Sequence, residues 1–173
     1  MMDTEIARQD RYLSSFGLHR NYIVGDGNCL FRAISYSLYG HQNYHQQLRQ
    51  LAVQTLRANI DEFADYFLND RGTPIEQIQR LGQLYTYAGQ ECIHALAKAL
   101  NINILVTFGG DDSSSEVITM ENTFSPDNFQ TQVHIIWSRF GGGHYEAVSD
   151  TECQDFVQQC VQPVNNDYLY TKP

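Results

Sequence analysis

Apolar positions in the first half of the chain repeat with the period of amphipathic helices. After Asn28, apolar or small residues recur every three to four positions as far as Gly40: Leu30, Ala33, Ile34, Ser37 and Leu38. Further helical segments are predicted over 3–17, 48–56, 62–68 and 89–101. Gly17 is suited to end the first of these helices, and Pro74 stands where the first turn of a helix tolerates proline.

The period changes to two in the second half. Over 132–140, Val133, Ile135 and Trp137 alternate with their neighbours, as in a half-buried strand. Other strands are predicted over 102–108, 116–124 and 144–148, the residues 109–115 have the composition of a turn, and a last helix is predicted over 152–161. Helices followed by neighbouring strands predict an α+β domain, with a small, mainly antiparallel or mixed β-sheet packed between helices.

Composition narrows the classes of function. The 173 residues include 20 acidic and 11 basic side chains, a formal net charge of -9, and such a surface repels the phosphate backbone of nucleic acids. No apolar run approaches the roughly 20 residues of a membrane span, and the N-terminus lacks the pattern of a signal peptide. Without repeats or a linker, we expect one domain over residues 1–173, acting as a monomer.

The four cysteines indicate the compartment in which the protein works. Cys29, Cys92, Cys153 and Cys160 form no CxxC pair and do not resemble a disulfide framework. Reduced thiols predict a cytoplasmic protein, either in its own cell or delivered into the cytosol of a host. Cys92 and Cys160 are flanked by apolar helical positions, which is typical of cysteines in a hydrophobic core.

Cys29 has a different context. It follows the turn-forming residues Asp26, Gly27 and Asn28 and stands in the first turn of a predicted helix. Unpaired N–H groups and the helix dipole favour an anion there, which lowers the pKa of a thiol and can also stabilise an oxyanion. From these residues alone, two interpretations of Cys29 are open. It is either an activated nucleophile or a small core thiol beside a loop that caps the helix.

A nucleophilic thiol needs a base, normally a histidine. His144 has the best context of the six histidines, because it joins a glycine-rich loop to a predicted strand, and Glu146 shares its face of that strand. His134, inside a strand, is the second choice, while His41 and His45 lie in a polar stretch typical of a surface. An incidental histidine in a hairpin loop is the alternative interpretation of His144. An early cysteine on a helix and a late histidine on a sheet follow the chain order of papain-like cysteine proteases.

Three stretches together resemble one family. GDGNCLFRAISYSLYG (25–40) resembles the signature of the OTU (ovarian tumour) cysteine proteases, most of which are deubiquitinases. HYEAV (144–148) resembles the second motif of that family. The block 87–106 resembles a third motif, which usually begins Trp-Gly-Gly and here begins Tyr87-Ala88-Gly89. The resemblance extends over about residues 22–148 and implies the papain-like OTU fold.

The resemblance also implies roles for individual residues. Cys29 is the expected nucleophile and His144 the general base and acid, with Asp26 in the catalytic set or in an oxyanion loop. Glu146 occupies the position where members usually carry Asp or Asn, so whether Asp26 or Glu146 orients His144 is open. The expected substrate-binding residues are Gly27, Asn28, Gly142, Gly143 and Tyr145. No metal and no cofactor are implied.

The implied reaction is hydrolysis of an isopeptide or peptide bond after the C-terminal glycine of ubiquitin, through a thioester. Ubiquitin or polyubiquitin chains are therefore the expected partners. Two alternatives remain: a protease for another ubiquitin-like modifier, and a weakly active ubiquitin-binding module.

Overall fold

A mixed β-sheet organises the part of the chain that the computed structural model describes, which is residues 4–69, 71–128 and 131–150. Its strands are β1 (Leu18–Asn21), β2 (Ile102–Gly109), β3 (Val117–Asn122), β4 (Thr131–Ser138) and β5 (His144–Asp150). They lie in the order β1-β5-β4-β2-β3, and neighbours are antiparallel except β2 and β4, which are parallel. The predicted sheet is therefore present, and it is of the mixed type.

The helical segments also follow the sequence pattern. They are α1 (Glu5–Ser15), α2 (Cys29–Tyr39), α3 (His45–Ala58), α4 (Pro74–Leu81) and α5 (Gln90–Leu100), with the 3-10 turns η1 (Ala64–Phe67) and η2 (Phe140–Gly142). Gly40 ends α2 in a left-handed conformation with φ 75°, and Pro74 begins α4 behind a capping box of Thr73 and Glu76. Local chemistry thus sets where these helices begin and end.

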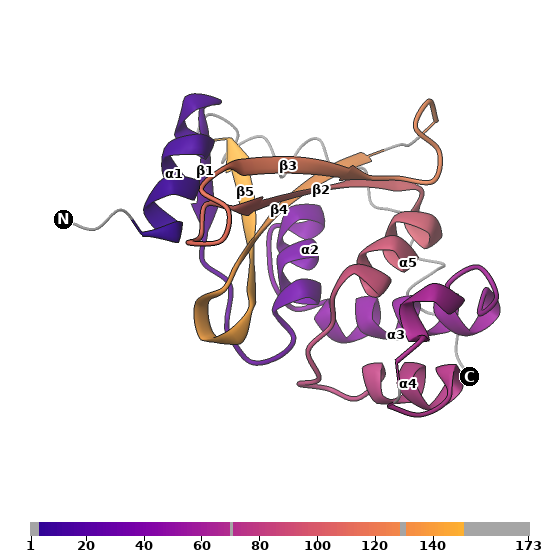
Figure 1. The fold of residues 1–173 in the computed structure, drawn as a ribbon. Helices are drawn as coiled ribbons and strands as arrows, with labels where there is room; N and C mark the ends of the chain where they lie inside the picture. Colours follow the sequence, from indigo (N-terminus) through magenta and orange to yellow (C-terminus); the bar gives the residue numbers. More distant parts are fainter. Residues whose placement is uncertain (1–3, 70, 129–130, 151–173) are drawn as a thin grey trace.

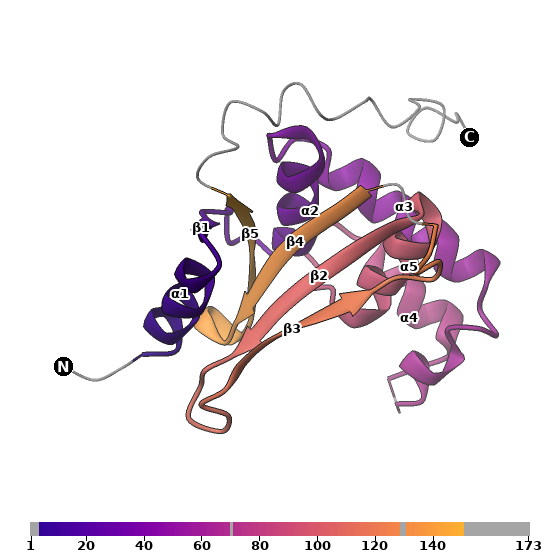
Figure 2. The ribbon, with the colours of Figure 1, turned by 90° about the horizontal axis from the view of Figure 1, so that it is seen from above.

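Helices cover both faces of the sheet, as two successive residues of β4 show. Ile135 points into the larger core with α2 and α5, whereas Ile136 contacts Leu13 of α1 and Val148 of β5 on the opposite face. In Figure 1, α2, α3, α4 and α5 lie below the sheet and α1 stands beside β1. Figure 2 looks down on the strands, with α3, α4 and α5 behind them and α1 at the edge next to β1. The predicted arrangement, a small sheet packed between helices, is confirmed.

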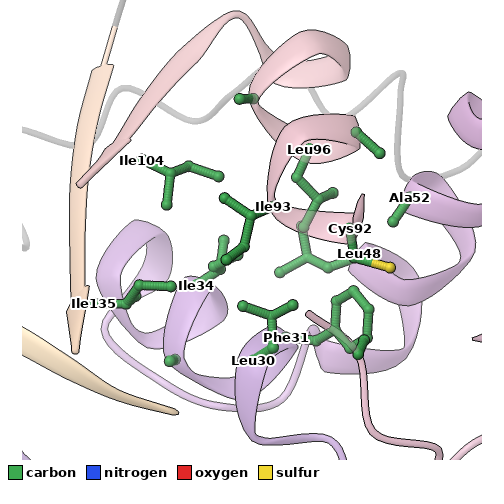
Figure 3. Close-up of a cluster of buried hydrophobic side chains, with 14 of the residues drawn as sticks. Leu30, Phe31, Ile34, Leu48, Ala52, Cys92, Ile93, Leu96, Ile104 and Ile135 are labelled. Carbon is green, nitrogen blue, oxygen red and sulfur yellow. The ribbon is translucent and has the colours of Figure 1, made fainter. Parts of the chain in front are cut away.

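The main core lies where α2, α3 and α5 meet beneath β2 and β4 (Figure 3). Leu30, Phe31, Ile34, Leu48, Ile93, Leu96, Ile104 and Ile135 are all essentially inaccessible to solvent there. Full burial of one such side chain contributes about 1.5–3 kcal/mol. Cys92 is also fully buried among them, which confirms its predicted place in the core. This core fixes the start of α2 relative to the sheet.

One predicted helix is shorter in the structure, and another lies outside the part of the chain that the structure describes. The helix predicted over 62–68 forms only the short turn η1, since a single turn already brings Phe63 and Phe67 to the core. The helix predicted over 152–161, together with Cys153 and Cys160, lies outside the described residues. Within the described part of the chain, no helix has the length and apolar character needed to cross a membrane.

Candidate active site

Cys29 is the first residue of α2, as the sequence predicts, and only 3% of its surface is exposed. Asn28 precedes it at the N-cap position, and the Asn28 side chain makes no capping hydrogen bond to the helix. The first-turn N–H groups of α2 are therefore left for another acceptor, the thiol or an oxygen bound beside it.

Burial raises the pKa of the Cys29 thiol above its ordinary value. Backbone N–H groups of Tyr145, of Leu30 and of Cys29 itself oppose this shift, while the nearby Asp26 carboxylate adds to it. The expectation of a lowered pKa at the helix N-terminus is thus wrong for the free protein, because desolvation outweighs the backbone amides. Burial therefore favours the neutral form of the thiol, so a base is needed to form the thiolate.

The loop before Cys29 is packed tightly against residue 85. Gly27 has a left-handed φ of 80°, and a Cβ at this position would lie 2.1 Å from the Tyr85 carbonyl oxygen. Any larger residue would collide with backbone, so only glycine fits. Tyr85 also has a left-handed φ of 67°, an unusual conformation for a large side chain. The tight contact therefore involves an uncommon backbone geometry on both sides.

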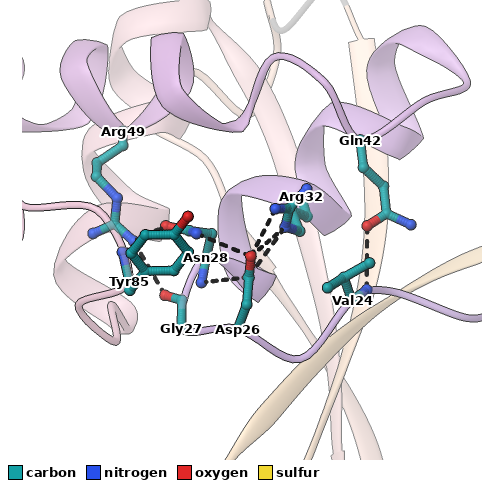
Figure 4. Close-up of polar contacts among 8 residues, drawn as sticks. All are labelled: Val24, Asp26, Gly27, Asn28, Arg32, Gln42, Arg49 and Tyr85. Atoms are coloured by element: carbon teal, nitrogen blue, oxygen red, sulfur yellow. Dashed lines mark hydrogen bonds and ion pairs between the residues drawn. The ribbon is translucent and has the colours of Figure 1, made fainter.

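A buried arginine joins this loop to the rest of the core (Figure 4). Arg49 of α3 is 1% exposed and lies over the Phe31 ring, with its guanidinium carbon 4.5 Å from the ring centre. It donates to the Gly27 carbonyl at 3.1 Å, to Asn28 Oδ1 at 2.9 Å and to the Leu81 carbonyl at 2.7 Å. Sequence reasoning missed Arg49, although a charged residue next to the apolar stripe of α3 was a usable signal.

The Asn28 side chain serves the same loop. Its Oδ1 accepts from Arg49 and, at 2.9 Å, from the Tyr85 N–H, while its Nδ2 donates to Asp26 at 3.2 Å. Asn28 is fully buried. The expected contact of Asn28 with substrate is therefore not supported, because no part of the residue is exposed, and its side chain instead fixes the loop.

Asp26 is held by Arg32, one turn into α2. The Arg32 Nη2 donates to Asp26 Oδ2 at 2.6 Å, and the Arg32 Nε lies 3.1 and 3.2 Å from the two carboxylate oxygens. The Asn28 N–H donates to Oδ1 at 3.1 Å. The Arg32 hydrogen bond is the largest cause that lowers the pKa of Asp26 to about 2. Both oxygens of Asp26 thus face the loop and helix that present Cys29.

His144 reaches the same place from the start of β5. A Cβ on Gly25 would lie 3.6 Å from the His144 Cε1 and 3.8 Å from its Nδ1, so the imidazole rests on the loop that leads to Cys29. The backbone N–H of Tyr145, the next residue, also acts on the Cys29 thiol, since it opposes the rise of the thiol pKa. The structure therefore places the start of β5, which carries His144, against α2, which begins with Cys29, although 114 residues separate the two in the sequence.

Glu146 lies two residues after His144 and is ion-paired with Arg20 of β1, at 3.1 Å between Nη1 and Oε1. Among the described residues, neither Asp26 nor Glu146 hydrogen-bonds to His144. Each acid is instead held by an arginine, Asp26 by Arg32 and Glu146 by Arg20.

Comparison with known proteins gives this geometry a family. Residues 24–145 match the sequence model of a family described as OTU-like cysteine protease. The chain belongs to this family. It is 36% identical over 147 residues to OTU domain-containing protein 1 of mouse, and the match covers 84% of this chain and 31% of the mouse protein. The chain thus spans about a third of the length of that relative.

Solved structures agree with the family and the fold. The OTU domain of OTUD1 has a TM-score of 0.74 and 34% identity, over 85% of this chain and 95% of that one. An ovarian tumour (OTU) domain in complex with ubiquitin has a TM-score of 0.58 at 21% identity and covers 87% of both chains. The OTU fold expected from the sequence is confirmed.

In this OTU domain, the glycine-rich turn before His144 passes beneath two aromatic residues. A Cβ on Gly143, whose φ is 123°, would lie 2.9 Å from the Tyr87 hydroxyl and 3.2 Å from the Trp137 Nε1. The Trp137 Nε1 donates to the Tyr87 hydroxyl at 2.7 Å. Gly142 has open space where its Cβ would be. Tyr87 and Trp137 were not predicted as site residues, although Tyr87 begins the third motif.

Tyr145 does not face solvent. It is 6% exposed, and its ring stacks on Tyr87 with 6.2 Å between centroids. A direct side-chain contact between Tyr145 and a substrate is therefore not supported, because the ring packs inward and only the backbone faces the thiol. The Tyr145 ring therefore supports Tyr87, whose hydroxyl group lies against Gly143.

Three other histidines of the OTU domain, His134, His41 and His45, are partly buried. His134 Nε2 lies 2.6 Å from the Thr107 hydroxyl, and burial lowers the pKa of His134 to about 4. His41 and His45 are half-buried rather than solvated, and His41 packs against Tyr39 and Tyr44. Within the described residues, no group of three His, Cys, Asp or Glu side chains is placed to hold a metal ion.

Proposed function

We propose that this OTU domain hydrolyses isopeptide or peptide bonds after the C-terminal glycine of ubiquitin. The observation that supports this most strongly is the meeting of Cys29, at the first position of α2, with the segment that begins β5 at His144. A helix start supplies N–H donors to an oxyanion, and an imidazole supplies the base that a buried neutral thiol needs.

In the proposed reaction, His144 takes the proton of the Cys29 thiol as the sulfur attacks the carbonyl carbon of the terminal glycine. First-turn N–H groups of α2 and the fixed loop 25–28 stabilise the oxyanion. His144 then gives its proton to the leaving lysine amine, and a thioester remains. Water, deprotonated by His144, attacks the thioester, and the thiol and the free carboxylate are released.

Two features support a tail of glycine residues as the substrate. Gly27 and Gly143 each leave no room for a side chain, and they lie on the two segments that meet at Cys29. We propose that an extended peptide without side chains lies between these two segments. The related OTU domain in complex with ubiquitin supports ubiquitin as the source of that tail.

A ubiquitin probe with a C-terminal electrophile tests the proposal. We expect it to label the wild type and the His134→Ala variant, and not Cys29→Ala. Turnover of di-ubiquitin should fall by about 10³-fold or more in His144→Ala and by less than about threefold in His134→Ala. Labelling that survives Cys29→Ala would overturn the assignment. Probes built on other ubiquitin-like modifiers, run in parallel, decide whether another modifier is preferred.

One observation favours a second candidate, a ubiquitin-binding module with weak activity. Among the described residues, His144 has no hydrogen bond to Asp26 or Glu146, so neither acid fixes the orientation of its ring in this structure. Calorimetric titration of ubiquitin chains, combined with a cleavage assay of all linkage types, separates the two candidates. Tight binding without cleavage of any chain would favour the module.

A further inference from the structure

The residues that hold Glu146 lie outside the segment that matches the OTU family. The match covers 24–145, whereas α1 and β1 occupy Glu5–Asn21, and Glu146 itself follows the match. The family motifs, which include Glu146, therefore give no role to the N-terminal part of the chain that forms α1 and β1. It nevertheless packs against the strand that begins with His144, since β1 pairs with β5 and Leu13 of α1 contacts Val148.

Arg20 is the centre of these contacts. Its side chain is 12% exposed, and its guanidinium bonds to three acceptors. The Nη1 donates to Glu146 Oε1 at 3.1 Å, the Nε to Asp10 Oδ1 at 2.9 Å and the Nη2 to Gln9 Oε1 at 2.8 Å. A planar fork bound to three groups has little freedom left, so Glu146 is held in one place relative to α1.

Gln9 extends this network to the strands beside β5. It is fully buried, and its Nε2 donates at 2.9 Å to the carbonyls of Gly109 and Trp137, at the ends of β2 and β4. A chain of hydrogen bonds thus runs from β2 and β4 through Gln9 and Arg20 to Glu146. Buried polar groups that are fully paired in this way hold their elements in one arrangement.

The N-terminal end of α1 holds the other side of the same turn. The Glu5 carboxylate accepts from the Arg139 N–H at 3.1 Å, and the Arg139 side chain pairs with Asp111 at 2.8 Å. Arg139 comes just before the three glycines at 141–143, all of which have positive φ. Glu5 and Arg20 therefore hold the two ends of the segment 139–146, and His144 lies between them.

We propose that Arg20 is a positioning residue, through which α1 and β1 set the place of Glu146 and of His144 beside Cys29. This inference rests on the proposed cysteine-protease function. The carboxylate of Glu146 ends a side chain with three rotatable bonds, so it has to be restrained before it can orient an imidazole. Arg20 occupies Oε1, and Oε2 accepts from no group in the described part of the chain, which leaves it for the imidazole.

A double-mutant cycle tests whether Arg20 acts through Glu146. Arg20→Ala should lower kcat for a fluorogenic ubiquitin amide by about tenfold and change KM by less than about twofold, because positioning acts on the chemical step. Arg20→Ala made in a Glu146→Ala background should have little further effect on kcat. Arg20→Lys, which keeps the charge and loses the fork, should restore part of the loss.

Matched controls separate positioning from folding. Arg57→Ala removes an arginine at an exposed position of α3, outside this network, and it should keep kcat within about twofold of wild type. Alkylation of Cys29 by iodoacetamide should be slowed several-fold by Arg20→Ala and by Glu146→Ala, and not by Arg57→Ala.

Three outcomes would overturn the role of Arg20: an unchanged kcat and alkylation rate in Arg20→Ala, fully additive losses in the double variant, or a loss that only follows the melting temperature. If the wild type does not hydrolyse the ubiquitin amide, the proposed function fails, and the alkylation rates still decide whether Arg20 positions the site.

Discussion

The segment 25–28, before Cys29, and the segment 139–146, around His144, meet at one site but are held very differently. In the first, side chains hold Asp26, Gly27 and Asn28, through Arg32 at Asp26 and through Arg49 and the Tyr85 N–H at Gly27 and Asn28. In the second, side-chain bonds hold only the two ends, and between them lie three glycines and the backbone pairing of β5 with β4.

The difference matches the chemistry that each side performs in the proposed reaction. Oxyanion donors act best when they are fixed before the substrate arrives, because reorientation during the reaction costs energy. A histidine that first accepts a proton from sulfur and then gives it to a leaving amine has to serve two positions. A rigid nucleophile loop facing a less restrained histidine segment suits this division of work.

The largest effect is expected when the anchor of the nucleophile loop is removed. Arg49→Ala leaves the Gly27 and Leu81 carbonyls without a donor and should lower the free energy of unfolding by about 3–5 kcal/mol. Arg57→Ala, at an exposed position on the same helix, should cost less than about 0.5 kcal/mol. Urea unfolding of both variants measures the contrast. Equal losses would mean that Arg49 does not anchor the loop.

Gly27→Ala should have the next largest effect. The new Cβ would meet the Tyr85 carbonyl and would also force alanine into a left-handed conformation, at a combined cost of about 2–4 kcal/mol. Gly40 has a similar φ of 75° and open space around it, so Gly40→Ala isolates the conformational part, about 1–2 kcal/mol. If thermal unfolding gives the same loss for both, the tight contact with Tyr85 adds nothing.

Gly143→Ala tests the histidine side in the same way, with a smaller expected effect on stability. Its Cβ would meet the ends of two side chains, Tyr87 and Trp137, which can move more easily than backbone. We expect about a tenfold loss of kcat from the displaced turn. Gly141→Ala, with nothing within 4 Å of the new Cβ, should retain most activity. Equal activities of the two variants would mean that the close contact of Gly143 with Tyr87 and Trp137 has no effect on catalysis.

The smallest expected effect comes from Asp26→Asn and depends on pH. The pKa of Asp26 is about 2 in the folded protein, below its ordinary value of 3.8, so its ionised form adds stability above pH 3.8. That contribution is lost as the pH falls through about 2. The difference between wild type and Asp26→Asn should be below about 1 kcal/mol at neutral pH, since solvent reaches the pair, and should vanish near pH 2. A difference that grows on acidification would contradict this.

Much of the fold could be predicted because its signals are local. The helical period of α2, the caps at Gly40 and Pro74 and the alternation of β4 depend on neighbouring residues only. The meeting of Cys29 and His144 depends instead on the whole sheet, and the sequence could favour it only through its likeness to a family.

The features that could not be predicted depend on contacts inside the folded domain. Arg49 and Arg20 look like surface residues in a list of charges, and their roles appear only when the acceptors around them are known. The pKa of Cys29 was wrongly expected to fall, since a helix start is visible in a sequence and the degree of burial of one thiol is not.

The contact between Tyr85 and Asn28 has a consequence for hydrogen exchange. Tyr85 is 68% exposed and lies in a loop, where amide protons normally exchange with solvent quickly. Its N–H, however, donates to the fully buried Asn28 Oδ1, which Arg49 also holds. This amide exchanges when its hydrogen bond to Asn28 breaks, that is, when the loop before Cys29 and residue 85 separate. The Tyr85 amide resonance is therefore a reporter, at the surface, of how often the nucleophile loses its fixed surroundings.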